Sequence, residues 1–237
     1  MGLKPSPDAN CLRRRHVRRT APTPAADAYT RARKSDVARS VVMADAVLRS
    51  DEEIAAARIG PLDVLNGPIV LADYDPAWPA LFDREAVRIR AALGSEALLV
   101  EHVGSTSVPG LAAKPRIDIV LAVPDSGDET RYVPALEAAG YVLCIREPDW
   151  YQHRVFKGPD TDVNLHVFSV GCGEIERMLR FRDHLRSNDA DRTLYESTKR
   201  TLAARAWKYT QHYADAKSEI VEGILTRADG CRSRDGG

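Results

Sequence analysis

A single carboxylate, Asp118, interrupts the otherwise apolar segment "IDIVLAV" (117–123), and the turn "GSTS" (104–107) comes shortly before it. A carboxylate within an apolar strand needs a cation, a base or a hydrogen-bond donor beside it. Two interpretations follow from the residue types. Asp118 forms a structural ion pair with a basic neighbour such as Arg116, or it is a ligand for a divalent cation beside a phosphate-binding turn.

The turn itself has the composition of an anion-binding site. Where a strand ends and a helix begins, backbone N–H groups lack intrahelical partners and attract phosphate. Gly104 would let a phosphate approach the backbone closely, and Ser105 and Thr106 would add hydroxyl donors. The alternative is a simple helix cap made by Ser105.

Two later segments, "HRVFKG" and "VNLHVFSV", are predicted strands that carry histidines. The first carries His153 and Arg154, and the second carries His166. Because side chains alternate along a strand, only one of His153 and Arg154 can face the same side as His166. A pair of Asp118 and His166 would suit a metal ion or general acid–base chemistry, whereas a hydrogen-bonded core histidine is the alternative for each imidazole.

Basic residues near these segments suit an anionic ligand such as a nucleotide. Lys114 belongs to this group, and Lys157 is expected in a solvated turn. Tyr209, Tyr213 and Lys217 follow at intervals of four, which predicts one face of a helix. That face would either cover a ligand or pack its aromatic rings on the core.

Apolar periodicity and turn residues predict the elements that position these groups. Strands are expected over residues 68–74, 97–103, 116–123, 141–147, 153–158 and 163–170. Helices are expected over 75–94 and 130–140, and the chain reads as helical from Glu174 onward. This order predicts an α/β (α+β) fold, with a mixed sheet flanked by helices and a helical C-terminal part.

Composition narrows the function classes. The 237 residues are 44% hydrophobic and 29% charged, as in a globular protein of one or two domains. Residues 1–50 carry 11 Lys and Arg against 4 Asp and Glu, a net charge of +7, so the remainder carries −7. An acidic remainder argues against general nucleic-acid binding, and no apolar run is long enough for a membrane span. Four scattered cysteines without CxxC spacing favour the cytoplasm.

The charge asymmetry predicts the domain organisation. Residues 1–60 are expected to form a basic, disordered extension, residues 61–228 the folded domain, and residues 229–237 a disordered tail. Two alternatives for the basic head stay open: an anion-binding arm, or translation that starts at Met43 rather than Met1.

The turn followed by an acid-bearing strand resembles the start of the nucleotidyltransferase fold. The resemblance extends along residues 66–228 to the GrpB family, a group described as predicted nucleotidyltransferases, some of whose members are fused to dephospho-CoA kinase. The segments that carry it are "YDPAWPALF", "EHVGSTSVPGLAAKPRIDIVLAV", "YQHRVF", "NLHVFSVG", "FRDHLRSN" and "YTQHYADAKSEIVEGIL". The resemblance implies that the Gly-Ser turn holds a triphosphate and that three acids hold two Mg²⁺ ions, or Mn²⁺ in their place.

The acid set implied by the resemblance is incomplete. Val120 stands where a second acid is expected, and the strand expected to carry the third offers Asn164 and His166. Asp118 and His166 are therefore predicted to form a reduced metal and catalytic site. Glu101 and Asp162 are the first candidates for completing it.

Three functions stay open at this point. The chain is a nucleotidyltransferase with a reduced metal site, a degenerate transferase that binds a nucleotide or another phosphorylated small molecule, or a non-catalytic accessory domain for a partner such as dephospho-CoA kinase. The second is favoured because acids are missing while the turn is retained. The residues predicted to contact the ligand are Gly104, Ser105, Thr106, Lys114, His153, Arg154 and Lys217.

Overall fold

The computed structural model describes residues 48–62 and 64–235. These described residues belong to one compact unit. The basic head over residues 1–47, with the alternative starts at Met1 and Met43, lies outside the described residues. Among the described residues, no helix is long and apolar enough to cross a membrane.

A five-stranded mixed sheet forms the centre of this unit. Its strand order is β2-β3-β6-β5-β4; β3 and β6 run parallel, and the other neighbours are antiparallel. The strands are β2 (Leu99–Val103), β3 (Ile117–Val123), β4 (Val142–Glu147), β5 (His153–Lys157) and β6 (Val163–Ser169). The predicted α/β fold with a mixed sheet is confirmed.

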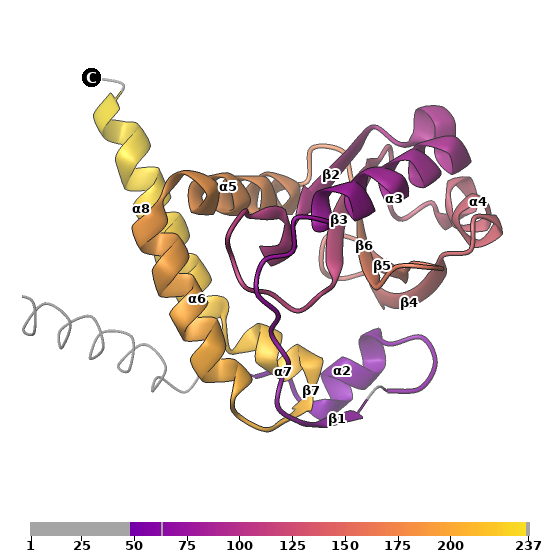
Figure 1. The fold of residues 1–237 in the computed structure, drawn as a ribbon. Helices are drawn as coiled ribbons and strands as arrows, with labels where there is room; N and C mark the ends of the chain where they lie inside the picture. Colours follow the sequence, from indigo (N-terminus) through magenta and orange to yellow (C-terminus); the bar gives the residue numbers. More distant parts are fainter. Residues whose placement is uncertain (1–47, 63, 236–237) are drawn as a thin grey trace, which may run out of the picture. The chain divides into compact units, whose positions relative to one another are not determined.

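One face of the sheet carries the main hydrophobic core. Helices α3 (Trp78–Leu93) and α4 (Val133–Ala138) lie on this side (Figure 1). Alternate residues of β3, such as Ile117 and Ile119, are fully buried against them. The helix predicted over 75–94 therefore forms, and Asp75 accepts a hydrogen bond from the Ala77 N–H just before it begins.

The opposite face of the sheet is only partly covered by apolar side chains. Val120, Ala122 and Phe168 pack there with residues of helix α5 (Gly173–Ser187). Toward the start of β3, the same face carries the polar residues Asp118 and Asn164, which are paired in register. The alternation of β3 and β6 thus places the predicted site outside the main core.

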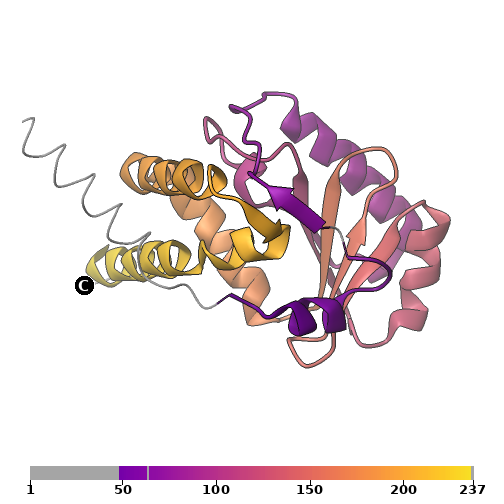
Figure 2. The same ribbon diagram turned by 90° about the horizontal axis from the view of Figure 1, so that it is seen from below.

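The C-terminal segment folds back beside this second face. It contains α6 (Asp189–Ala203), β7 (Trp207–Tyr209), α7 (Thr210–Asp215) and α8 (Ser218–Asp235). A short strand, β1 (Val64–Gly67), pairs antiparallel with β7 and lies beside it in Figure 2. Helix α8 extends into residues 229–235, which were expected to belong to a tail.

Two segments near the start of the described chain differ from the sequence expectations. Residues 68–74 form no continuous strand; Ala72 makes a single bridge to Ala113, and Val70 is exposed. Within the extension expected over residues 1–60, helix α2 (Asp51–Ala57) is capped by the side chain of Ser50, and the Ile59 N–H donates to the carbonyl of Cys144 on β4. Three short 3₁₀ turns complete the elements: η1 (Gly94–Glu96), η2 (Ser105–Ser107) and η3 (Glu129–Arg131).

Candidate functional site

The Gly-Ser turn follows β2 and packs directly on Asp118. Gly104 has φ 68° and ψ −172°, in a region where L-residues are strained. A Cβ built on Gly104 would lie 2.9 Å from Cβ and 3.0 Å from Cγ of Asp118. The space above Gly104, which was expected to admit a phosphate, is therefore filled by the Asp118 side chain.

The hydroxyl groups of the turn serve two different purposes. The Thr106 hydroxyl donates to the carbonyl of Arg116, and its oxygen lies 3.0 Å from Nε2 of His102. Because that hydroxyl already donates its only proton, His102 supplies the proton of the second bond. Burial lowers the pKa of His102 to about 4, so this imidazole is neutral. Thr106 therefore fastens the turn to the sheet, and both Ser105 and Thr106 line the adjoining cavity.

Asp118 is held by an amide on the adjacent strand β6, and that amide is held in turn by a lysine on β5. Asn164 Nδ2 donates to Asp118 Oδ1 at 2.8 Å, and Lys157 Nζ donates to Asn164 Oδ1 at 2.7 Å. Lys157 is thus half-buried at the end of β5, and the expectation that it lies in a solvated turn is wrong. Hairpin pairing with β6 places it on the sheet.

Two imidazoles connect Asp118 to an acid on the far strand. His166 Nε2 lies 4.0 Å from Asp118 Oδ1, and His166 Nδ1 lies 3.1 Å from His153 Nε2. His153 Nδ1 in turn lies 2.7 Å from Glu147 Oε2. Asp118, His153 and His166 therefore face the same side of the sheet, and of the pair His153 and Arg154 it is His153 that faces this side.

Lysines from the C-terminal segment and from the loop before β3 converge on one tyrosine ring. Nζ of Lys114 lies 5.7 Å from the ring centroid of Tyr213, and Nζ of Lys217 lies 4.6 Å from it. Among the described residues, neither lysine has a carboxylate within salt-bridge distance. Burial lowers the pKa of Lys114 to about 8, and the charges of Lys217 and Arg116 act in the same direction.

A third lysine, Lys199 of α6, lies at the same end of the site. It is almost fully buried, donates to the carbonyl of Ala112, and lies 4.9 Å from the ring centroid of Tyr195. Burial lowers its pKa to about 7, and the charge of Lys217 adds to the effect. Lys199 is not among the residues predicted from the sequence, although it lies on the same helical stripe as the buried residues Tyr195 and Leu202.

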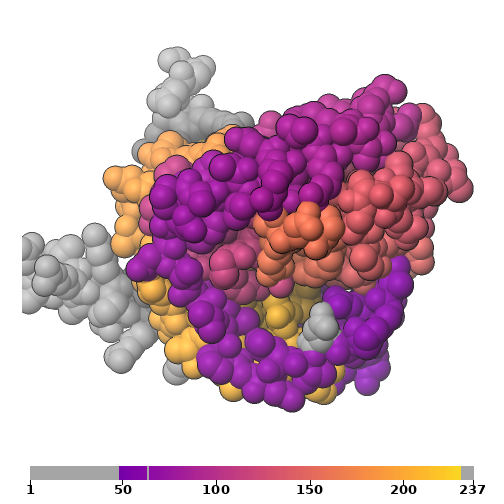
Figure 3. Space-filling model, turned by 45° about the vertical axis from the view of Figure 1, so that its right-hand side comes forward, coloured from indigo at the N-terminus to yellow at the C-terminus, as the bar shows by residue number. Residues whose placement is uncertain are grey.

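The Gly-Ser turn, Asp118, the two histidines and the lysines described above line one cavity of about 720 Å³. It lies between the open face of the sheet and the C-terminal segment. Figure 3 shows a hollow between the orange strand segment and the indigo N-terminal part of the described chain, with yellow C-terminal residues visible inside it. Its lining includes eight Lys and Arg side chains but three carboxylates. Of the predicted ligand residues, the lining includes Gly104, Ser105, Thr106, Lys114, His153 and Lys217, together with Asp118 and His166.

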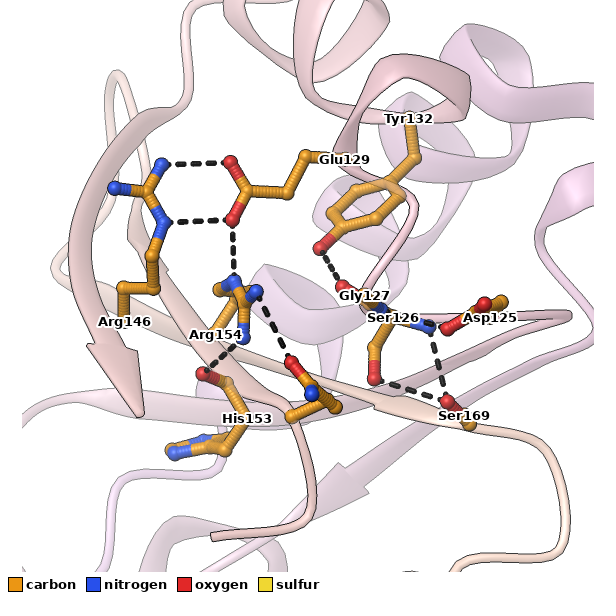
Figure 4. A network of polar contacts seen from close by, with 10 residues as sticks. Asp125, Ser126, Gly127, Glu129, Tyr132, Arg146, His153, Arg154 and Ser169 are labelled. Atoms are coloured by element: carbon orange, nitrogen blue, oxygen red, sulfur yellow. Dashed lines mark hydrogen bonds and ion pairs between the residues drawn. The ribbon is translucent and has the colours of Figure 1, made fainter. Parts of the chain in front are cut away.

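Arg154 does not belong to this cavity. Its Nε donates to Glu129 of η3 at 2.5 Å, and Arg146 binds the same carboxylate through two bonds of 2.6 Å. Figure 4 shows the Arg154 guanidinium against Glu129 while the His153 ring points away from that carboxylate. The prediction that Arg154 lies at the ligand site is therefore wrong. Neighbouring residues of a strand face opposite sides of the sheet, so Arg154 points away from the side that His153 faces.

The side chains around Asp118 do not fit the two-metal site that the resemblance implies. Val120 is fully buried where the second acid would stand, and Asn164 donates to Asp118 from the strand expected to carry the third. The described residues contain no group of three or more His, Cys, Asp and Glu side chains that could hold a metal ion. One carboxylate and one imidazole are a poor donor set for Mg²⁺ or Mn²⁺, which prefer several oxygen ligands.

Neither of the two acids considered for completing such a site is free to do so. Glu101 binds Arg182 at 2.8 Å, and Asp162 binds Arg116 at 2.7 Å. Both carboxylates are therefore engaged in ion pairs with arginines.

Comparisons with known proteins agree that the chain is related to GrpB and UPF0157 proteins. Residues 68–227 match the family described as GrpB protein. A UPF0157 protein of Halalkalibacterium halodurans is 64% identical over 181 residues, which are 76% of this chain and 93% of that protein. The crystal structure of conserved protein GrpB from Enterococcus faecalis shares 33% identity and a TM-score of 0.60, covering 67% of this chain and 96% of that one.

A more distant relative is longer than the shared region. A dephospho-CoA kinase of Mycolicibacterium paratuberculosis is 29% identical over 191 residues. The match covers 70% of this chain but 47% of that protein.

Proposed function

The chain belongs to the GrpB family, and from this premise we propose that it binds a nucleotide or another phosphorylated small molecule in the cavity beside the Gly-Ser turn. The observation that carries the proposal is the convergence of Lys114 and Lys217 on the ring of Tyr213 without a carboxylate partner among the described residues. Two ammonium groups held close together repel each other, and a bound anion relieves that repulsion.

The surroundings of the two lysines support a small organic anion rather than a lone surface ion. A volume of about 720 Å³ falls within the usual range for ligand sites. Lys157 adds a third ammonium group at the sheet side, and the rings of Tyr213 and Tyr195 give the cavity an apolar wall. The phosphate would lie between the lysines, and the rest of the ligand would extend along the aromatic wall.

The Gly-Ser turn has a structural part in this proposal. Gly104 allows the Asp118 side chain to pack against the turn, and Ser105 lines the cavity. Nucleotidyl transfer through two metal ions is not part of the proposal, because Val120 and Asn164 stand where acids would be needed. Any group transfer would have to use the side chains that are present.

Calorimetry with three compounds tests the proposal. Inorganic pyrophosphate and ADP should both bind at neutral pH, whereas adenosine, which lacks phosphate, should bind much more weakly. Equal binding of adenosine and ADP would contradict a phosphate site. An absence of heat with every compound, confirmed by equilibrium dialysis with labelled ADP, would reject the proposal.

A second candidate function is an accessory domain for a partner enzyme. The similarity to a longer dephospho-CoA kinase, which this chain matches over less than half of that protein, favours it. This alternative predicts that the purified chain co-elutes with a separately expressed bacterial dephospho-CoA kinase on size-exclusion chromatography. It also predicts that Lys114→Met does not alter the co-elution, because the partner would not use the cavity.

A further inference from the structure

Four polar side chains from four strands lie in a row along the lining of the cavity. They run from Glu147 on β4 through His153 on β5 and His166 on β6 to Asp118 on β3. The successive atom-to-atom distances are 2.7, 3.1 and 4.0 Å. The two imidazole planes differ by 8° and their ring centroids are 5.3 Å apart. This geometry fits two nearly parallel rings joined at their edges by an N–H···N hydrogen bond.

The start of this line is locked in place. Glu147 also accepts a bond of 2.6 Å from Arg49, and its pKa stays below its ordinary value because His153 and Arg49 outweigh the opposing effect of burial. The His153 ring is buried and stacks on Phe168, with ring centroids 4.6 Å apart. An ionised, fixed carboxylate therefore sets the orientation of everything after it.

The carboxylate also sets the direction of the protons. Ionised Glu147 can only accept, so Nδ1 of His153 carries a proton and donates to it. In the relay Nε2 of His153 is the acceptor, so Nδ1 of His166 carries a proton and donates to His153. Nε2 of His166 is left with a lone pair that faces Asp118 and the cavity.

A donor is missing between the last two groups. Nε2 of His166 and the Asp118 carboxylate are both acceptors, and the 4.0 Å between them is too long for a direct hydrogen bond. Asn164 supplies one donor to Asp118, but no described side chain supplies one to Nε2 of His166. The side chain of His166 is 20% exposed and that of Asp118 is 30% exposed, so a group in the cavity can reach both.

We propose that Glu147, His153 and His166 form a general-base relay that takes a proton from a hydroxyl group, of a ligand or of water, held beside Asp118. His166 would be the catalytic residue, and His153 and Glu147 would be positioning residues. The identity of the ligand rests on the phosphorylated small molecule proposed above, whereas the direction of the relay does not.

The proton transfer balances within the relay. The O–H bond of the hydroxyl breaks and a bond from that hydrogen to Nε2 of His166 forms. The Nδ1 proton of His166 passes to Nε2 of His153, so the positive charge moves to His153, where Glu147 neutralises it. The negative charge stays on the hydroxyl oxygen, beside groups on which the charge of Lys157 acts. General-base catalysis of this kind requires a neutral acceptor at working pH.

The burial of His166 keeps it neutral. Burial, together with His153 and Lys157 on β5, lowers its pKa to about 4 against the opposing charges of Asp118 on β3 and Glu147 on β4. The lone pair at Nε2 is therefore present at neutral pH.

Nitrogen-15 NMR of the histidine side chains of the wild-type chain tests the inference without any ligand. At pH 7 His166 should be neutral with its proton on Nδ1, and Nδ1 of His153 should carry the proton donated to Glu147. In Glu147→Gln the fixed direction is lost, so His166 should shift to a mixture of both tautomers. His184, which is bonded to Asp191 on α6, serves as the control and should not change.

Chemical modification provides a second readout. Diethyl pyrocarbonate should acylate His166 at its free Nε2 but not His153, both of whose nitrogens are engaged. A wild-type His166 that is charged or carries its proton on Nε2 at pH 7 would overturn the relay. Because neither experiment contains a phosphorylated ligand, this outcome is distinguishable from a failure of pyrophosphate to bind.

Discussion

The Asp118 side chain lies directly against Gly104, at a distance that leaves no room for a Cβ on the glycine. The turn and the acid-bearing strand, which are separated along the chain, therefore form one packed unit. Register pairing of Val103 with Asp118 across β2 and β3 brings them together. The sequence "GSTSVPGLAAKPRID" accordingly combines a structural requirement for glycine with the placement of an acid at the cavity.

This contact predicts that Gly104→Ala is more destabilising than Gly110→Ala. Both glycines have a positive φ, but a Cβ on Gly110 meets nothing within 4 Å. Gly110→Ala should cost about 1–2 kcal/mol from backbone strain alone. Gly104→Ala should cost about 1–3 kcal/mol more because of overpacking against Asp118. Urea unfolding of the two variants measures the difference, and equal losses would contradict the contact.

The N-terminal boundary of the folded unit predicts a sharp effect of truncation. Arg49 binds Glu147 at 2.6 Å, and its N–H donates to Asp215, while Ser50 caps α2. A chain that starts at residue 51 should lose about 1–3 kcal/mol of stability relative to one that starts at residue 48, from the lost cap and the lost ion pair. Thermal melting compares them, with Arg49→Ala as the matched point variant. Indistinguishable melting temperatures would show that these contacts do not contribute to the stability of the fold.

Lys114 should lower the stability of the protein at neutral pH. Its pKa is about 8 in the folded chain against 10.5 for an ordinary lysine, so its burial penalty is fully present below pH 8 and is relieved as pH rises toward 10.5. Lys114→Met should therefore stabilise the fold at pH 7, by an amount on the order of 1–3 kcal/mol, and the gain should shrink by pH 10. Urea unfolding at both pH values measures this. A variant that is less stable at pH 7 would contradict the burial penalty.

Binding of pyrophosphate should not require a divalent cation. The lysines supply the positive charge, and the donor set at Asp118 and His166 suits Mg²⁺ poorly. Titrations with EDTA and with Mg²⁺ should give dissociation constants within about threefold of each other, a difference below about 1 kcal/mol. Binding that appears only with Mg²⁺ or Mn²⁺ would contradict this expectation and would favour a metal site at Asp118.

The sequence predicts the sheet and one part of the site well because both follow from local alternation. The strands at 97–103, 116–123 and 163–170 are found close to their predicted limits. The same alternation predicts that Asp118 and His166 share one face of the sheet. It does not decide which of His153 and Arg154 faces the cavity, since that depends on the pairing of β5 with β6.

Other parts of the site depend on contacts that are distant in sequence. Lys199 and Lys217 reach the cavity because α6 and the segment after α7 fold back beside the sheet, and Glu147 acquires its position from Arg49 and His153. The strand expected at 68–74 is absent because the chain there pairs only at Ala72, while β1 forms earlier, opposite β7. No local pattern encodes such long-range pairings.

The affinity of pyrophosphate for lysine variants tests the central claim most directly. Calorimetry at pH 7 should show that Lys114→Met and Lys217→Met each weaken binding about ten- to hundredfold, the loss of one charge-assisted contact of about 1.5–3 kcal/mol. Lys208→Met is the control, because Lys208 is half-exposed, pairs with Asp51 and does not line the cavity. It should leave the affinity unchanged. Equal weakening by all three variants would reduce the effect to net charge, and unchanged affinity in Lys114→Met and Lys217→Met would contradict a phosphate site between these lysines.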